Sequence, residues 1–307
     1  MTITLQTSKL VEIFVMCDDF CKKFSQYHLE NGLESELPTQ GMSESELMSI
    51  IIFYHLSGFR CFKYYYLYVV CGPLKSYFPN TYSYAHFVAM IKRVNFQLYA
   101  FLCLCRTAGM GPGNYIDATK LVVCHNKRIP SHKVFNGIAK RGKSSTGWFF
   151  GFKLHAVINN MGQLVVFSMT PGNVSDANPA LLQKLTQRLE GFLYGDAGYI
   201  SSLAKAFKSR GLELITKLRE NMKPQKLTPE QKYYLQHRGL IESVFNLLKN
   251  FCDIEHSRHR SPLNFMVNLW GGLLAYTFLD QLPSIPEYVH KIGKQEALDI
   301  AKNIVLI

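Results

Sequence analysis

The chain has 307 residues, 48% of them hydrophobic, with eight cysteines and a formal net charge of +12 at pH 7. This length and apolar content suit one large folded domain or two ordinary ones with a sizeable core. The cysteines include no CxxC pair, and no apolar run is long and uninterrupted enough to cross a bilayer, so the composition argues against a disulfide framework, a zinc cage and a membrane-spanning protein.

The positive charge is concentrated in the second part of the sequence. Residues 1–110 carry nine Lys and Arg against eight Asp and Glu, whereas residues 111–307 carry twenty-five against fourteen. A basic region of this size is typical of a protein that binds a polyanion, most simply nucleic acid. A basic protein without such a partner is the alternative. Most of the cysteines lie in apolar runs, which is typical of buried reduced thiols, so we expect a cytoplasmic protein. We also find no signal-peptide pattern at the N-terminus.

Residues 1–110 are predicted to form a helical N-terminal domain. A linker is predicted at residues 30–42, and Ser43 with Glu46 forms a capping box at the start of the helix that follows it. Ser83 is a candidate cap for a later basic helix. Helix, turn and capped basic helix are compatible with a helix-turn-helix that contacts DNA. A plain helical bundle is the alternative, and the near-neutral charge favours it.

Strand patterns begin after a glycine-rich segment at residues 109–113, which predicts a hinge between domains. The first strand is predicted over 115–123. The second and third, 148–158 and 163–169, are joined by a hairpin turn. Between the first two strands, residues 125–146 hold six Lys and Arg, two His and no acid, which predicts a mobile basic loop.

Helices and strands alternate in the remainder of the sequence. Ser175 or Asp176 is predicted to cap the first of these helices. The predicted elements are a helix to Leu189, a strand at 192–194, a helix at 201–210, a strand at 212–216, and helices at 229–252, 267–279 and 285–307. Three antiparallel strands followed by parallel additions give a mixed five-stranded sheet flanked by helices. We therefore predict an α/β catalytic domain at 111–280 and a helical tail at 281–307.

Three acidic residues are candidates for chemistry. Asp117 lies inside the first strand, where Asp is unusual, and Asp196 follows the fourth, at the end of a strand where ligand sites form. Glu242 lies on the polar stripe of a long helix, between Arg238 and Lys249. In this topology the first and fourth strands can be neighbours, with the helix packed across them. An ion pair on a solvated helix face is the alternative for Glu242.

Three carboxylates in one cleft need a proton or a cation. Each pair repels by about 4 kcal/mol at ~4 Å and an effective dielectric of ~20. Ligation by oxygen alone favours Mg²⁺ or Mn²⁺ over zinc. Two such ions ~4 Å apart can activate a water or a 3′-hydroxyl and stabilise the leaving oxygen at a phosphorus. The basic loop and Lys249 would then meet the phosphate backbone.

In these and neighbouring motifs the sequence resembles bacterial insertion-sequence DDE transposases, which have an RNase H-like catalytic core. More narrowly, it resembles the insertion-sequence-982 family. The resemblance covers roughly residues 40–280. It rests on Tyr-Ile-Asp-Ala-Thr-Lys at 115–120, Cys-His-Asn-Lys-Arg at 124–128, Arg-Gly-Lys-Ser-Ser-Thr-Gly-Trp-Phe-Phe-Gly-Phe-Lys-Leu-His at 141–155, Gly-Asp-Ala-Gly-Tyr at 195–199, Ile-Glu-x-x-Phe-x-x-Leu-Lys at 241–249, and Glu-His-Ser-Arg-His-Arg-Ser-Pro at 255–262.

The resemblance implies that Asp117, Asp196 and Glu242 are the catalytic metal ligands, for two Mg²⁺ or Mn²⁺ ions. It also implies that Arg238 and Lys249 belong to the family signature Tyr-x-x-Arg-x-x-x-Glu-x-x-x-x-x-x-Lys. The chain has Leu, at position 235, where the signature has its Tyr. In related enzymes that Tyr helps to handle a flipped or hairpinned DNA end.

The implied function is transposition: water cleaves DNA at the element ends, and the released 3′-hydroxyl attacks target DNA. The alternatives are an RNase H-like nuclease that only hydrolyses and a transposase-derived DNA-binding protein. We expect double-stranded DNA as the partner (terminal inverted repeats and target), no membrane, a homodimer because two ends must be joined, and a location at the bacterial nucleoid. The candidate DNA-binding residues are Lys127, Arg128, Lys133, Lys140, Arg141, Lys143, Tyr199, Arg238, Lys249, Arg258 and Arg260.

Three smaller features keep two interpretations each. His155 lies on a strand and is either a core histidine or part of the site. Tyr199 either stacks on a base or packs in the protein. Residues 256–260, with Glu255, are interpreted as a DNA-contacting turn, with a metal site as the weaker alternative.

Overall fold

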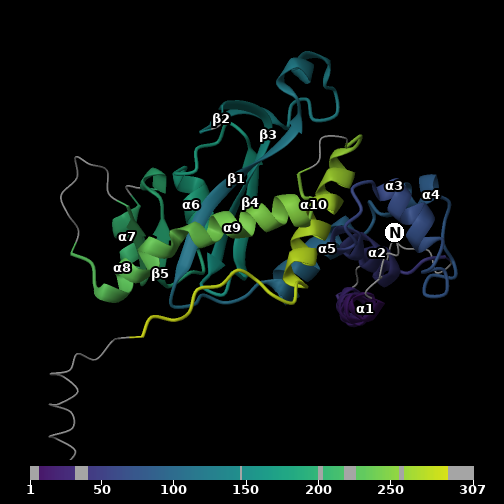
Figure 1. The fold of residues 1–307 in the computed structure, drawn as a ribbon, viewed down its shortest axis with the longest axis horizontal. Coiled ribbons are helices and arrows are strands. Elements are labelled where there is room, and N and C mark those ends of the chain that lie inside the picture. The colour runs from purple at the N-terminus through teal and green to yellow at the C-terminus, as the bar shows by residue number, and fades with distance from the viewer. Residues whose placement is uncertain are drawn as a thin grey trace, which may run out of the picture.

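The structure is a computed structural model that describes residues 7–31, 41–145, 147–199, 203–217, 226–255 and 259–289. Helices come first along the chain, followed by a mixed sheet and the helices that cover it (Figure 1). Most of the predicted linker at 30–42 lies outside the described residues, as do Arg258 and most of the predicted C-terminal tail. The predicted fold class, an α/β core preceded by a helical region, is confirmed.

The first part of the chain, which we call the helical region, has five α-helices in its described residues. They are α1 (Thr7–Glu30), α2 (Glu44–Leu56), α3 (Phe62–Tyr65), α4 (Tyr84–Met90) and α5 (Asn95–Phe101), with π-helical turns at Tyr66–Val70 and Leu102–Arg106. Ser43 and Glu46 form the predicted capping box at the start of α2. Ser83 caps α4 by accepting a hydrogen bond from the N–H of His86. Both caps are confirmed, because a cap depends on neighbouring residues alone. The helix that Ser83 caps is not the predicted basic one, since α4 ends at Met90, before Lys92 and Arg93.

The sheet has six strands, one more than predicted. They are β1 (Asn114–Cys124), β2 (Lys140–Ser144), β3 (Gly147–Asn159), β4 (Leu164–Pro171), β5 (Gly191–Gly195) and β6 (Leu212–Thr216). The order is β2-β3-β1-β5-β6, and β4 also pairs with β3. The strands β1 to β4 pair antiparallel, whereas β5 pairs parallel with both β1 and β6. The mixed sheet is therefore the one that the chain order predicted.

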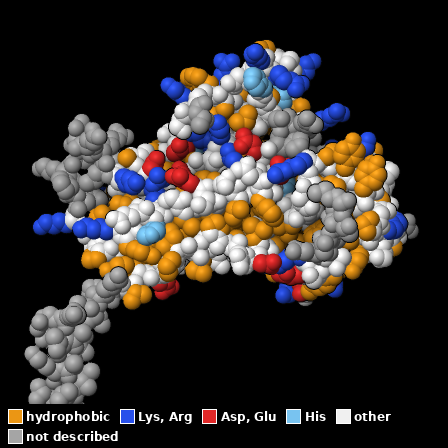
Figure 2. All heavy atoms as spheres, viewed as in Figure 1, with side chains coloured by type: hydrophobic (Ala, Val, Ile, Leu, Met, Phe, Trp, Pro, Cys, Tyr) orange, Lys and Arg blue, Asp and Glu red, His pale blue; other side chains and the backbone are white. Residues whose placement is uncertain are grey.

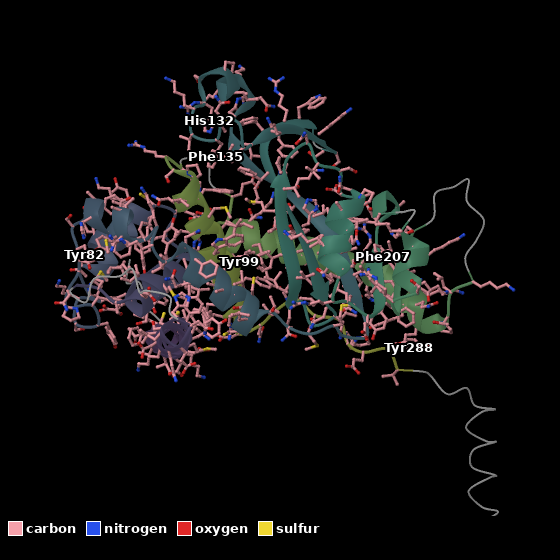
Figure 3. The ribbon with its side chains drawn as sticks, turned by 180° about the vertical axis from the view of Figure 1, so that it is seen from behind. Tyr82, Tyr99, His132, Phe135, Phe207 and Tyr288 are labelled. Atoms are coloured by element: carbon pink, nitrogen blue, oxygen red, sulfur yellow. The ribbon has the colours of Figure 1, made fainter. Side chains whose placement is uncertain are left out.

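Residues 125–145, which we call the basic arm, are more ordered than the sequence predicted. Asn126–Ser131 form a 3₁₀-helix, and β2 pairs with the start of β3. Phe135 is 1% exposed, and its ring packs 5.7 Å from Phe152 and 5.3 Å from Phe265. Figure 3 shows Phe135 and its neighbour His132 at the end of the molecule formed by this arm. The prediction of a mobile loop is wrong, because a buried aromatic ring anchors the arm to the core.

The helices of the second part are α6 (Pro179–Thr186), α7 (Ala204–Lys208), α8 (Pro229–Gln236), α9 (Leu240–Asn246) and α10 (Pro262–Thr277). Asn178, not Ser175 or Asp176, caps α6 by accepting from the N–H of Leu181. A 3₁₀-turn joins α8 to α9, and a π-helical turn follows at Leu247–Phe251. Together they form the predicted long helix, which lies across the sheet in Figure 1.

The described start of the predicted tail, residues 281–289, is not helical, contrary to prediction. Pro283 and Pro286 each lack a backbone N–H, and this disfavours a helix. The segment instead lies along the protein: Ile285 donates to the carbonyl of Asn160 at 2.8 Å, and the Tyr233 hydroxyl donates to the carbonyl of Pro286 at 3.1 Å.

The helical region packs on α10, which contacts α2 and α5. The ring of Tyr99 on α5 lies 5.1 Å from Trp270 and 6.1 Å from Phe167 on β4, and Figure 3 shows it at this junction. The chain just before the glycine-rich segment is also held in place, since the N–H of Ala108 donates to the carbonyl of Leu164 at 2.8 Å. A domain boundary and hinge near residue 110 stay predictions. No single described helix is both long and apolar enough to cross a membrane.

The β1–β3 pairing leads to a stability prediction. A Cβ added to Gly151 on β3 would lie 2.0 Å from the backbone oxygen of Leu121 on β1, so the strands would have to separate. We expect Gly151→Ala to cost about 1–3 kcal/mol of unfolding free energy, measured by urea denaturation. Gly109→Ala, with nothing within 4 Å of the added Cβ, is the matched control. Equal stability of the two variants would contradict the described β1–β3 contact.

Candidate active site

Asp117 lies in the middle of the sheet, on β1 between β3 and β5. Its position pairs with Ala156 of β3, and its side chain is 23% exposed. The Oδ1 atom accepts a hydrogen bond from the N–H of Ala118 at 2.8 Å. This bond fixes the carboxyl group against its own strand, and no described N–H donates to Oδ2.

Asp196 lies beside Asp117 because β1 and β5 run parallel in a fixed register. Tyr115 pairs with Tyr194. Asp117 lies two residues after Tyr115, and Asp196 lies two residues after Tyr194. At Gly195 an added Cβ would lie 3.2 Å from Ile116, so the two chains are still in close contact one residue before the carboxylates. Asp196 also accepts a backbone N–H at Oδ1, from Gly198 at 2.8 Å. The predicted proximity of the first and fourth strands is confirmed.

Glu242 joins this group through Arg238. Arg238 Nη2 lies 3.3 Å from Glu242 Oε1, and Arg238 Nη1 lies 4.0 Å from Asp117 Oδ2. The guanidinium group is largely buried, with 18% of the side chain exposed, whereas the Glu242 side chain is 63% exposed. The helix α9 packs on β1, as predicted. The structure therefore places a cation between the strand carboxylate and the helix carboxylate.

The electrostatics at Asp117 are unfavourable for its charge. Burial raises the pKa of this carboxyl group to about 6, and the neighbouring charges of Asp196 and Asp176 raise it further, while the Ala118 N–H and Arg238 oppose the change. A buried carboxyl group beside two other acids is a common feature of catalytic and cation-binding sites.

Asp176 is a site residue that the sequence interpretation missed. Its Oδ1 accepts a hydrogen bond from Lys153 Nζ at 2.9 Å, which makes an ion pair, and lies 3.8 Å from His155 Nδ1. The negative charge of Asp176 contributes to the raised pKa values of Asp117 and of the Tyr199 hydroxyl. The signal was present in Asn178 followed by Pro179, since Pro at the first helical position marks Asn178 as the cap and frees Asp176.

His155 is a core histidine. Its side chain is fully buried on β3, and its Nε2 lies 2.8 Å from Thr170 Oγ1. Burial lowers the pKa of the ring below its ordinary value, despite the nearby charge of Asp176. The neutral ring therefore packs behind Asp176.

The residues present suit a divalent cation. Within the described ranges, no three Asp, Glu, His or Cys side chains already form an arrangement that holds a metal. Asp117 and Asp196 nevertheless each hold one oxygen on a backbone N–H and leave the other without a described N–H donor. The Nε of Arg238 is buried there without a hydrogen-bond partner in the described structure. Carboxylate oxygens of this kind are the ligands that Mg²⁺ and Mn²⁺ prefer.

The same segment of the chain is the part that matches a known family. The family described as transposase DDE domain matches residues 108–262, about half of the chain. The chain belongs to this family. No curated protein is significantly similar to it. The matched residues begin just before β1, end at the start of α10, and include all three predicted metal ligands.

The transposase domain presents most of its candidate DNA-binding cations on the basic arm. Lys127, Arg128, Lys133, Lys140, Arg141 and Lys143 are all exposed there. Figure 2 shows basic side chains projecting from this end of the molecule, and acidic and basic side chains side by side on the central part of the same face. Arg260, just before α10, is also exposed. DNA binding by the helical region stays a prediction.

Two candidate DNA contacts have other roles in the structure. Tyr199 is 2% exposed and belongs to a core cluster with Ile116, Leu193 and Phe207, which favours packing over contact with a base. Lys249 forms an ion pair with Glu255 at 2.7 Å, and Glu255 also accepts from the N–H of Val122 at 3.0 Å. Through Glu255, Lys249 therefore helps to hold β1 at Val122, where the β1–β3 register is irregular.

The raised pKa of Asp117 leads to a prediction on stability. Between about pH 4 and pH 6 the folded protein keeps a proton that the unfolded chain has lost, so the free energy of unfolding falls as pH rises through this window. Asp117→Asn removes this cost. In EDTA at pH 7.5 we expect the variant to be more stable than the unmodified protein, by on the order of 2 kcal/mol, with the difference disappearing below pH 4.

Urea unfolding at pH 3.5, 5 and 7.5 measures this difference. Asp19→Asn, at an exposed position on α1, is the control and should keep the pH dependence of the unmodified protein. A variant at Asp117 that is no more stable at pH 7.5 would contradict the electrostatics described here.

Proposed function

We propose that this protein is the transposase of a bacterial insertion sequence, of the insertion-sequence-982 family, which cleaves DNA at the element ends and joins it to a target. The observation that carries the proposal is the position of Asp117 on β1 near Asp196, which directly follows the neighbouring parallel strand β5, with Glu242 linked to Asp117 through Arg238. The match to transposase DDE domains over the same residues supports it.

Asp117, Asp196 and Glu242 would hold two Mg²⁺ or Mn²⁺ ions. Bound ions of this kind supply Lewis-acid stabilisation of charge at a phosphorus and a nucleophile at neutral pH. The two aspartates are held by backbone N–H groups, whereas Glu242, whose side chain is 63% exposed, is held by Arg238 at 3.3 Å. Arg238 balances the carboxylates and orients Glu242, so the chain itself keeps the acids together before a ligand binds.

The basic arm supports a path for DNA beside these carboxylates. The arm, with its six exposed cations, directly follows β1, the strand that carries Asp117. Its strand β2 pairs with β3, the neighbour of β1. Cations of this kind bind the phosphate backbone without reading sequence. We propose that the arm binds the element's terminal repeats or the target, and that a homodimer joins two ends. The proposed location is the bacterial nucleoid.

Substitution of the acids tests the proposed chemistry. Asp117→Asn, Asp196→Asn and Glu242→Gln should each lower Mg²⁺-dependent cleavage of the element ends by at least about a thousandfold, since bound metal supplies several kcal/mol to the transition state. Filter binding in EDTA should show nearly unchanged DNA affinity. Asp280→Asn, which removes an exposed carboxylate paired with Lys9, is the control and should cleave normally.

A strand-transfer assay with pre-cut ends separates transposition from simple hydrolysis. Joined products that depend on the three acids support the transposase. Cleavage without any joining would show a nuclease, and activity that survives all three substitutions would end the proposal.

The salt dependence of binding tests the basic arm. Replacing Lys140, Arg141 and Lys143 with Gln removes three exposed cations. We expect the slope of log affinity against log salt to become shallower by up to about 3, measured by fluorescence anisotropy on duplex DNA. Lys22→Gln with Lys23→Gln, on α1, is the control. An unchanged slope for the arm variant would show that DNA follows another surface.

A further inference from the structure

A cavity lies at the junction of the helical region and α10. Its volume is about 590 Å³, within the range of roughly 300–1,000 Å³ that is usual for small-molecule sites. Its walls come from α2, α3, α4, and from the start of α10 with the residues before it. None of Asp117, Asp196 and Glu242 lines it, so the cavity is separate from the carboxylates of the active site.

The body of this cavity is aromatic. Tyr54, Phe62 and Tyr84 line it, and the rings of Tyr54 and Phe62 meet edge to face at 5.0 Å. Tyr84 is only partly buried and carries Lys63 over its ring, with Nζ 5.9 Å from the ring centre. Aromatic walls of this kind suit a flat, apolar ring that can stack or pack against them.

Two amides on α10 provide polar groups at the cavity. Asn264 and Asn268 lie one helical turn apart, and both line it. The Oδ1 of Asn264 and the Nδ2 of Asn268 are buried and have no hydrogen-bond partner in the described structure. Leaving a buried acceptor and a buried donor unpaired costs free energy. The pair therefore matches a ligand that presents both a donor and an acceptor along one edge.

The charges at the cavity are all positive. Arg60, Lys63 and Arg260 line it, and no Asp or Glu does. Arg60 is held by Asp253 at 3.0 Å and by the carbonyl of Asn250 at 2.6 Å. Lys63 and Arg260 have no carboxylate partner among the described residues. Burial raises the pKa of Tyr84 and the charge of Arg260 opposes this, so Arg260 lies near the ring. The cavity is thus suited to an anion next to an aromatic ring.

We propose that this cavity binds one unpaired nucleotide of a DNA substrate. The base would pack against Tyr84 and Phe62, its hydrogen-bonding edge would meet Asn264 and Asn268, and its phosphate would meet Lys63 and Arg260. A nucleobase combines a flat ring with adjacent donors and acceptors, and amides are suited to pair with such an edge. An acidic peptide would use the cations but would leave the paired amides and the aromatic walls without a matching group. The inference rests on the proposed DNA-binding function and adds a base-binding site to it.

The test compares three duplexes that differ at one position. One has a single extrahelical adenosine, the second has an abasic residue in its place, and the third is fully paired. Affinities are measured by fluorescence anisotropy in EDTA, so that no cleavage occurs. We expect the unmodified protein to bind the extrahelical base about tenfold more tightly than the abasic site, since stacking and edge hydrogen bonds each contribute on this scale.

Substitutions then assign this preference to the cavity. Tyr84→Ala, and Asn264→Leu with Asn268→Leu, should each remove most of the tenfold preference while affinity for the paired duplex changes little. Tyr84→Phe, which keeps the ring, should retain it. Tyr68→Ala is the matched control, because Tyr68 is a 68% exposed aromatic residue outside the cavity. Affinity for the paired duplex also reports that each variant is folded.

The outcomes separate this inference from the proposed function. Equal affinity for all three duplexes would overturn the base-binding site and leave DNA binding intact. A preference that survives both cavity variants would also overturn it. Asp117→Asn should keep the preference, because that residue does not line the cavity. Failure to bind any duplex would overturn both this inference and the DNA-binding function on which it rests.

Discussion

The parallel pairing of β1 with β5 is the constraint on which the rest of the site depends. It brings Asp117 on β1 near Asp196, which directly follows β5, although the two are far apart in sequence. Asn114 fixes the start of this pairing: its buried side chain donates to the carbonyls of Gly111 and Phe192, at 2.6 and 3.0 Å. The segment that leads into β1 and the strand β5 are therefore held by one amide.

Placing acids side by side in a buried sheet costs free energy, and the chain offsets this cost locally. Backbone N–H groups hold one oxygen of each aspartate, and Arg238 stands between Asp117 and Glu242. Lys249 and Glu255 secure β1 from the other end of the same helical run, at Val122. Arg238 and Lys249 thus both act on the strand that carries the first acid. The helix therefore both carries Glu242 and holds β1 in place.

The elements that depend on local sequence could be predicted. The capping box at Ser43, the strand that contains Asp117 and the helix that contains Glu242 all follow from spacing and cap chemistry. The pairing of the first and fourth strands followed from chain order, because parallel strands joined through helices tend to be neighbours. This was enough to select the two aspartates and their neighbourhood from sequence.

Features that depend on tertiary contacts could not be predicted in the same way. The burial of Phe135, which orders the basic arm, and the burial of Tyr199 depend on what packs against them. The ion pair of Lys249 with Glu255 joins residues that local periodicity does not connect. The role of Asp176 in the site was not predicted, because the sequence pattern also allowed it to be the helix cap. When a side chain has two possible local roles, its contacts in the folded protein show which one it has. For Asp176 that contact is the ion pair with Lys153.

Metal-directed cleavage of the protein tests most directly whether Asp117, Asp196 and Glu242 share divalent ions. Fe²⁺ placed in the site with ascorbate and peroxide generates radicals that cut the backbone next to the bound ion. Mass spectrometry then locates the cuts. This account predicts cuts close to residues 117, 196 and 242 together, all suppressed by excess Mg²⁺. Cuts near the two aspartates but not near Glu242, or cuts at an unrelated position, would contradict it.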